Sequence, residues 1–152
     1  MEFKYISGGA ETLDAFEKKC NEMLASKFIV ADVRIRNILK SIAGSRRLLS
    51  VFAAAAEGFN FDVEFDKAIT VENGKKRVAL PDNPLLNAAF VYALFWEIDN
   101  KNIDLHKLLN EYYASGPAIN DRYRFFCESV VAEFRDNVVY LYTDENIPDI
   151  LS

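Results

Sequence analysis

The most hydrophobic stretch of the chain runs from Leu85 to Ile98, where only Asn87 and Glu97 are plainly polar. A helix that is apolar nearly all round must be enclosed by other elements on every side. The stretch is also shorter than the roughly 20 apolar residues that span a bilayer. The pattern therefore predicts a central, buried helix over residues 84–99, and no membrane as a partner.

Several other segments repeat apolar residues every three or four positions, which is the period of an amphipathic helix. These segments predict helices at residues 10–27, 31–43, 46–57, 104–113 and 120–142. Each helix can turn its apolar side toward the central helix and its polar side toward water. We therefore expect an all-α, or α-dominated, bundle of about six helices in a single domain over residues 1–152.

In the segment 59–69 the apolar residues fit two different periods. Phenylalanine and valine alternate there with polar residues, which is typical of a strand, but Phe61, Phe65 and Ile69 are four positions apart, which is typical of a helix. Since the neighbouring segments are helical, we favour a short helix over a strand.

A β-hairpin is predicted directly afterwards, near residues 69–80. β-Branched residues lie on both sides of Asn73 and Gly74, and Asn-Gly is the strongest signal for a two-residue hairpin turn. An isolated hairpin is only marginally stable in water, so this one is expected to lie against the helices.

Composition and charge narrow the possible partners. The chain is 51% hydrophobic and carries a formal charge of −5, which disfavours nucleic acid and anionic lipid as partners. Its first residues lack the pattern of a signal peptide, and we expect a small bacterial protein of the cytoplasm. Cys20 and Cys127 fall on apolar helix faces, so both are expected to be buried thiols.

Residues that usually perform catalysis are scarce, and we predict no cofactor or metal site. His106 is the single histidine, in the first turn of a predicted helix, so it cannot supply a two-histidine zinc site. It is either a packing or solvated residue or a general base. Glu97 either lies where the central helix emerges into solvent or is a buried acid with a raised pKa.

Charged residues are unevenly distributed in the first half of the chain. A basic block covers residues 27–47, and an acidic block without any basic residue covers residues 57–66. Either the two blocks pair, within one chain or between subunits, or the basic face is solvated. A third interpretation is a basic patch that takes phosphate or nucleic acid, but no aromatic residues alternate with the basic ones as single-strand binding requires. The candidate interaction residues of the basic block are Arg34, Arg36, Arg46 and Arg47.

Aromatic residues concentrate in the second half of the chain. The first interpretation is that these rings pack together as core. Because adjacent residues of a helix point in different directions, a second interpretation places one ring of the pair Tyr112 and Tyr113 toward a partner. Alternatively, the aromatic residues line a cavity for an apolar ligand, near residues Phe90, Leu94, Tyr112 and Phe134.

These patterns favour a non-enzymatic interaction module, an adaptor or regulatory protein that self-associates as a dimer or binds a protein partner. One alternative is a protein that binds a small apolar ligand. The other is a metal-dependent enzyme that uses the carboxylate of Glu97, since magnesium prefers oxygen ligands. No motif in the chain is specific enough to indicate a family.

Overall fold

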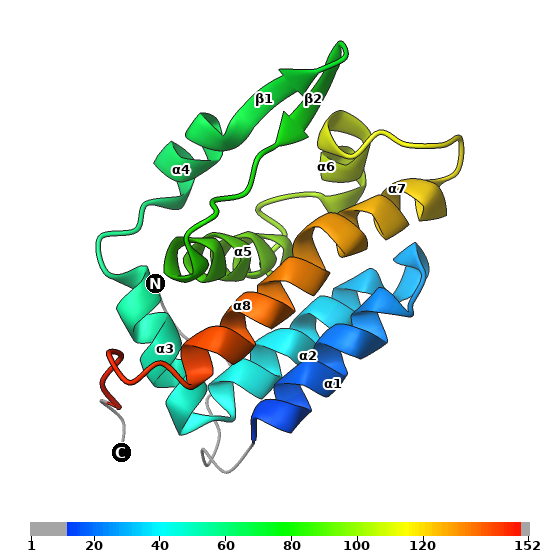
Figure 1. Cartoon of the computed structure of the whole chain (residues 1–152). Helices are drawn as coiled ribbons and strands as arrows, with labels where there is room; N and C mark the ends of the chain where they lie inside the picture. The colour runs from blue at the N-terminus through cyan, green and yellow to red at the C-terminus, as the bar shows by residue number, and fades with distance from the viewer. Residues whose placement is uncertain (1–11, 150–152) are drawn as a thin grey trace.

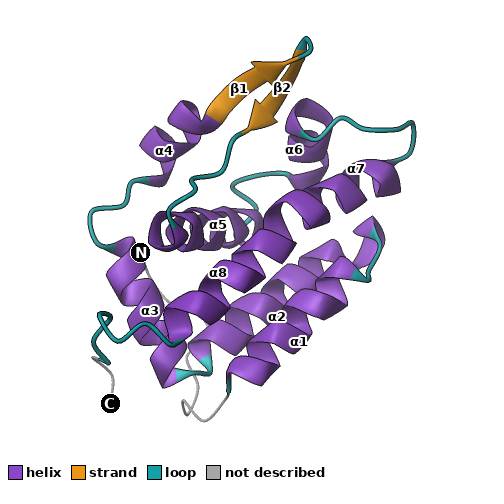
Figure 2. Ribbon diagram, in the orientation of Figure 1, coloured by secondary structure: helices purple, strands orange, loops and turns teal. Residues whose placement is uncertain are grey.

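The computed structural model describes residues 12–149 (Figure 1). They form an α-dominated fold with one small antiparallel hairpin, as the sequence predicts (Figure 2). The helices are α1 (Leu13–Leu24), α2 (Ala31–Ala43), α3 (Arg46–Ala56), α4 (Phe61–Ala68), α5 (Pro84–Asp99), α6 (Leu105–Tyr112), α7 (Ile119–Phe126) and α8 (Ala132–Tyr142). None of the helices within residues 12–149 is long and apolar enough to cross a membrane.

Helix α5 is the central helix, and its bounds match the prediction. Asn83 caps its first turn by accepting a hydrogen bond from the N–H of Leu86, and Pro84 occupies the first helical position. Helices α2, α3, α4 and α8 all contact it (Figure 1). Its buried polar residue, Asn87, donates a hydrogen bond of 3.4 Å to the main-chain oxygen of Pro81.

The last long helix of the prediction contains a π-helical turn. Helices α7 and α8 are joined without a break by the π turn Cys127–Val131, so the helix runs continuously from residue 119 to 142. A π turn inserts one extra residue and shifts the register of the side chains that follow it. Here the shift lets residues on both sides of the turn, from Tyr123 to Leu141, face the same core.

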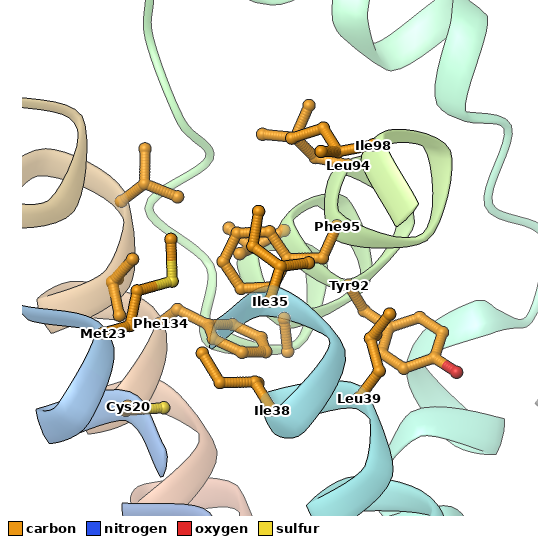
Figure 3. Packing of buried hydrophobic residues seen from close by; sticks show 14 of the residues in the cluster. Cys20, Met23, Ile35, Ile38, Leu39, Tyr92, Leu94, Phe95, Ile98 and Phe134 are labelled. Carbon is orange, nitrogen blue, oxygen red and sulfur yellow. The ribbon is translucent and has the colours of Figure 1, made fainter. Parts of the chain in front are cut away.

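Phe134 of α8 lies where four helices meet. Its ring contacts those of Phe16 at 5.7 Å, Phe52 at 6.0 Å and Phe95 at 5.6 Å between centroids. These partners belong to α1, α3 and α5, and Figure 3 shows Phe134 beside Phe95 and near Ile38 of α2. Edge-to-face and tilted contacts of this kind are the favourable geometries for aromatic pairs.

The segment 59–69 contains helix α4, so the helical period is the one the chain follows. Strands β1 (Ile69–Glu72) and β2 (Lys75–Val78) come next and pair in the register Ile69↔Val78 to Glu72↔Lys75. The turn residues Asn73 and Gly74 have φ angles of 52° and 77°, as a two-residue hairpin turn requires. The predicted hairpin is confirmed.

The first helix is shorter than the predicted range 10–27. Helix α1 starts at Leu13 after Thr12 and ends at Leu24, while residues 10 and 11 lie outside the described part of the chain. Its last turn is closed by Ser26, whose hydroxyl donates to the main-chain oxygen of Met23 at 2.7 Å. A single 3₁₀ turn, Phe28–Val30, then leads into α2.

Candidate functional site

The 3₁₀ turn between α1 and α2 presents the most exposed large apolar side chain of the described residues. Ile29 is 90% exposed, and Val33, one helical turn further on, is 51% exposed. Isolated apolar residues are common on protein surfaces, so Ile29 matters only through what surrounds it.

Phe28 attaches this turn to α6 and α7. Its N–H donates a hydrogen bond of 2.9 Å to Oδ1 of Asn120. Its ring lies 6.1 Å from that of Tyr123 and 5.7 Å from that of His106. With Phe28 held against α6 and α7, the adjacent Ile29 extends toward solvent.

Two shallow hollows flank Phe28. The first, of about 390 Å³, is lined by Phe28, Ile29, Asp32, Ile119 and Asn120. The second, of about 230 Å³, shares Phe28 and Asp32 and continues over Ile98, Ile103 and His106. We call these eight residues the corner surface. Five of the eight residues are apolar, and three, namely Asp32, Asn120 and His106, are polar, a mixture that protein interfaces also show.

The corner surface carries charges of both signs, since Asp32 belongs to it and Lys101 lines its second hollow. Asp32 and Lys101 form an ion pair of 3.0 Å between Oδ2 and Nζ, and both side chains are exposed. Exposed ion pairs contribute little to stability, about 0–1 kcal/mol. These two charges are therefore free to exchange partners when another surface approaches.

Of the residues that the sequence singled out, His106 is the one that lies in the corner surface. It is exposed, and its ring rests beside Phe28. Glu97 is half-buried near the end of α5, where its main-chain oxygen accepts hydrogen bonds from the N–H groups of Asn102 and Ile103. Within residues 12–149, no three His, Cys, Asp or Glu side chains are grouped so that they could hold a metal ion.

The four arginines of the basic block are dispersed. Arg34 pairs with Glu22 at 3.6 Å, and Arg36 pairs with Asp99 at 3.2 Å. Both of these acidic partners lie outside the acidic block. Arg46 is exposed on the first turn of α3.

Arg47 binds the chain segment that follows α8. Its guanidinium donates hydrogen bonds to the main-chain oxygens of Tyr142, Asp144 and Ile147 at 2.9, 2.8 and 2.8 Å. Carbonyl oxygens at a helix end lack partners within the helix, and a planar guanidinium can satisfy several of them together. Arg47 thus holds the end of the described chain against α3.

Tyr112 and Tyr113 are both buried. The Tyr112 ring meets Phe65 edge-on at 5.6 Å, and the Tyr113 ring meets Phe126 edge-on at 5.1 Å. Burial raises the pKa of both phenols above its ordinary value. The two rings belong to the core. So do the four residues near which the sequence predicts a ligand cavity: Phe90, Leu94, Tyr112 and Phe134.

Both cysteines are buried free thiols, as expected. Burial raises the pKa of Cys20, and it raises that of Cys127 to about 12, so neither thiol ionises near neutral pH. The thiol of Cys127 lies 3.9 Å from the main-chain oxygen of Met23. These groups pack as small apolar residues and have no feature of a reactive site.

Sequence reasoning missed Ile29. Phe28, Ile29 and Val30 are all apolar, so periodicity does not show which of them faces outward. The available signal was the short connection between two helices, where the chain reverses and three consecutive side chains cannot all face the core.

Comparison with family models, with curated proteins and with solved structures finds no match to this chain.

Proposed function

We propose that this protein is a non-enzymatic interaction module that self-associates, with a dimer formed through the corner surface. The observation that carries the proposal is Ile29, 90% exposed beside a hollow of about 390 Å³ that it helps to line. Burying such a side chain stabilises an assembly by about 1.5–3 kcal/mol.

A protrusion and a hollow on the same surface suit a twofold dimer. In such an assembly the same patch of both copies meets, so whatever protrudes from one copy must fit the other. Ile29 of each copy can enter the hollow of the other, against Ile119 and Phe28. The exposed charges of Asp32 and Lys101 can then pair across the axis instead of within one chain.

The two alternative functions have less support from the described residues. An apolar ligand needs an enclosed apolar cavity, but the aromatic rings near Phe90 and Phe134 pack against one another. An enzyme that uses Glu97 needs further oxygen ligands for a metal, and the described acidic residues are not grouped in that way.

A cytoplasmic location remains part of the proposal. Its support is the state of the cysteines, since Cys20 and Cys127 are unpaired and buried in different helices. Reduced thiols of this kind are typical of proteins from reducing compartments.

Light scattering coupled to size-exclusion chromatography, over a range of protein concentrations, tests the proposal. We expect a dimer whose dissociation constant rises at least tenfold in Ile29→Ser, because the substitution removes the apolar side chain from the interface. Val63→Ser is the matched control, since Val63 is also an exposed apolar residue but lies on α4. A wild-type protein that stays monomeric throughout, or equal effects of both variants, would contradict the proposal.

A further inference from the structure

Among residues 12–149, other elements cover one edge of the hairpin and leave the other edge open. Strand β2 lies between β1 and α6 (Figure 1), and its side chains bond to α6 and to the segment that follows α6. Lys76 Nζ lies 3.5 Å from Oε1 of Glu111, and Arg77 donates to the main-chain oxygens of Tyr112 and Ala114. The outer edge of β1 faces away from the helices (Figure 1).

The hydrogen-bond pattern of the hairpin shows which groups this edge presents. In an antiparallel pair, residues that exchange hydrogen bonds alternate with residues whose N–H and C=O groups point outward. The two-residue turn makes Glu72 and Lys75 a hydrogen-bonded pair. The N–H of Ala79 donates to the main-chain oxygen of Ala68 at 2.7 Å, so the pair 68 and 79 is also hydrogen-bonded, as the same alternation requires. Val71 therefore directs its N–H and C=O away from β2, as does Ile69.

Residues that normally protect an edge lie on the covered strand. Natural proteins discourage pairing at open edges with lysine, proline or bulges. The basic residues Lys75, Lys76 and Arg77 belong to β2, whereas β1 reads Ile-Thr-Val-Glu. Its Val71 is 70% exposed, so both the main chain and an apolar side chain are accessible at the edge.

The surroundings of β1 are acidic. Residues 57–72 carry five carboxylates, namely those of Glu57, Asp62, Glu64, Asp66 and Glu72, against one basic residue, Lys67. Lys67 pairs with Glu64 at 3.7 Å, and the acidic side chains at positions 57, 62, 66 and 72 are exposed. A second β1 strand at this edge would bring like charges together, whereas a basic strand would meet opposite ones.

We propose that the outer edge of β1 is a docking site for an extended, basic peptide segment of a partner protein. The segment adds a third strand to the hairpin through the outward main-chain groups of Val71 and Ile69. Its alternate apolar side chains lie beside Val71, and its basic side chains lie on the face of Glu72. This surface is separate from the corner surface, so the proposal does not depend on self-association.

Fluorescence anisotropy with a labelled decapeptide of alternating lysine and valine, capped at both ends, tests this site. The full-length protein should bind it and should not bind the matching decapeptide of glutamate and valine. Val71→Pro should weaken binding at least tenfold, because proline removes the outward N–H without removing a bond to β2. Val71→Thr keeps that N–H and is the matched control.

A second variant leaves the main chain intact. Asp66→Asn combined with Glu72→Gln removes two exposed charges and should weaken binding by about three- to tenfold, with a smaller salt dependence than the wild-type protein. Equal binding of the basic and acidic peptides, unchanged binding by both variants, or no binding at all would overturn the proposal.

Amide hydrogen exchange identifies what occupies the edge. The N–H of Val71 should exchange rapidly in the free protein and slowly when the basic peptide is bound. Slow exchange in the free protein at every concentration would mean that another part of the same chain already covers β1. Protection that appears only as the protein concentration rises would mean that a second copy does. Either result would overturn the proposal.

Discussion

The guanidinium of Arg47 donates a hydrogen bond of 2.8 Å to the main-chain oxygen of Ile147, 100 positions further along the chain. Two more of its N–H groups reach the oxygens of Tyr142 and Asp144. A single side chain of α3 thereby binds both the C-terminal end of α8 and the segment that follows it.

Replacing Arg47 with alanine should lower the free energy of unfolding by about 2–3 kcal/mol, because three partly buried carbonyl groups lose a charged donor. Arg47→Lys should recover less than half of this loss, since an ammonium cannot match the planar arrangement of donors. Urea denaturation measures both values. The adjacent Arg46 is exposed, so Arg46→Ala is the control and should change stability by less than about 0.5 kcal/mol. Equal losses for the two alanine variants would contradict this role.

Phe134 should be the most sensitive position of the core, because its ring joins α1, α3 and α5 to α8. We expect Phe134→Ala to destabilise the protein by about 3–5 kcal/mol, through lost burial and the cavity it leaves. Thermal denaturation followed by circular dichroism measures the effect. Tyr140→Ala removes an exposed ring from the same helix and should have little effect. A loss below about 1 kcal/mol for Phe134→Ala would contradict the packing described here.

Arg77 should hold the hairpin in place. Besides its hydrogen bonds to Tyr112 and Ala114, its guanidinium lies 5.0 Å from the centre of the Phe125 ring. Arg77→Ala should therefore increase the amide exchange of Thr70, which bonds to β2, at least tenfold while leaving the exchange of α5 unchanged. Lys75→Ala, at the exposed end of the same strand, should not do so.

Stability should fall at alkaline pH. Burial raises the pKa of Tyr92 and Tyr123 above the ordinary value of 10.0, and that of Cys127 from 9.0 to about 12. In the unfolded chain these groups lose their protons at the ordinary values, while in the folded chain they keep them. The unfolded state therefore binds fewer protons above pH 9, and stability decreases as pH rises.

Each such group should contribute a slope of about 1.4 kcal/mol per pH unit between its unfolded and folded pKa. Urea denaturation between pH 8 and 11 measures the slope. Tyr92→Phe should reduce it, because the substitution removes one of the buried phenols. A stability that is constant over this range would contradict the burial of these groups.

The sequence predicts the elements of this fold better than it predicts the roles of individual residues. Residues 84–99 are apolar on nearly all sides, and Asn73-Gly74 has few alternatives to a tight turn, so both predictions are confirmed. The π turn at Cys127–Val131 escapes prediction because apolar steps of three and four positions fit an uninterrupted helix as well.

Hydrophobic periodicity does not predict which residues distant in the chain contact one another. Arg47 belongs to a basic cluster in the sequence, but its partners are main-chain oxygens. Every residue has such an oxygen, so the sequence does not show which ones Arg47 binds. Tyr112 and Tyr113 are adjacent, and the prediction that one ring faces a partner assumes a regular helix. Helix α6 ends at Tyr112, so the chain turns between them and both rings become buried.

In the proposed dimer, Ile29 of one copy enters the hollow of the other. The most direct test is isotope-filtered NMR on a mixture of labelled and unlabelled protein, which detects contacts only between copies. We expect contacts from the methyl groups of Ile29 to the side chain of Ile119 in the second copy, and their loss in Ile29→Ser. Contacts between copies that involve other surfaces, or a monomer without any such contacts, would contradict the proposed dimer.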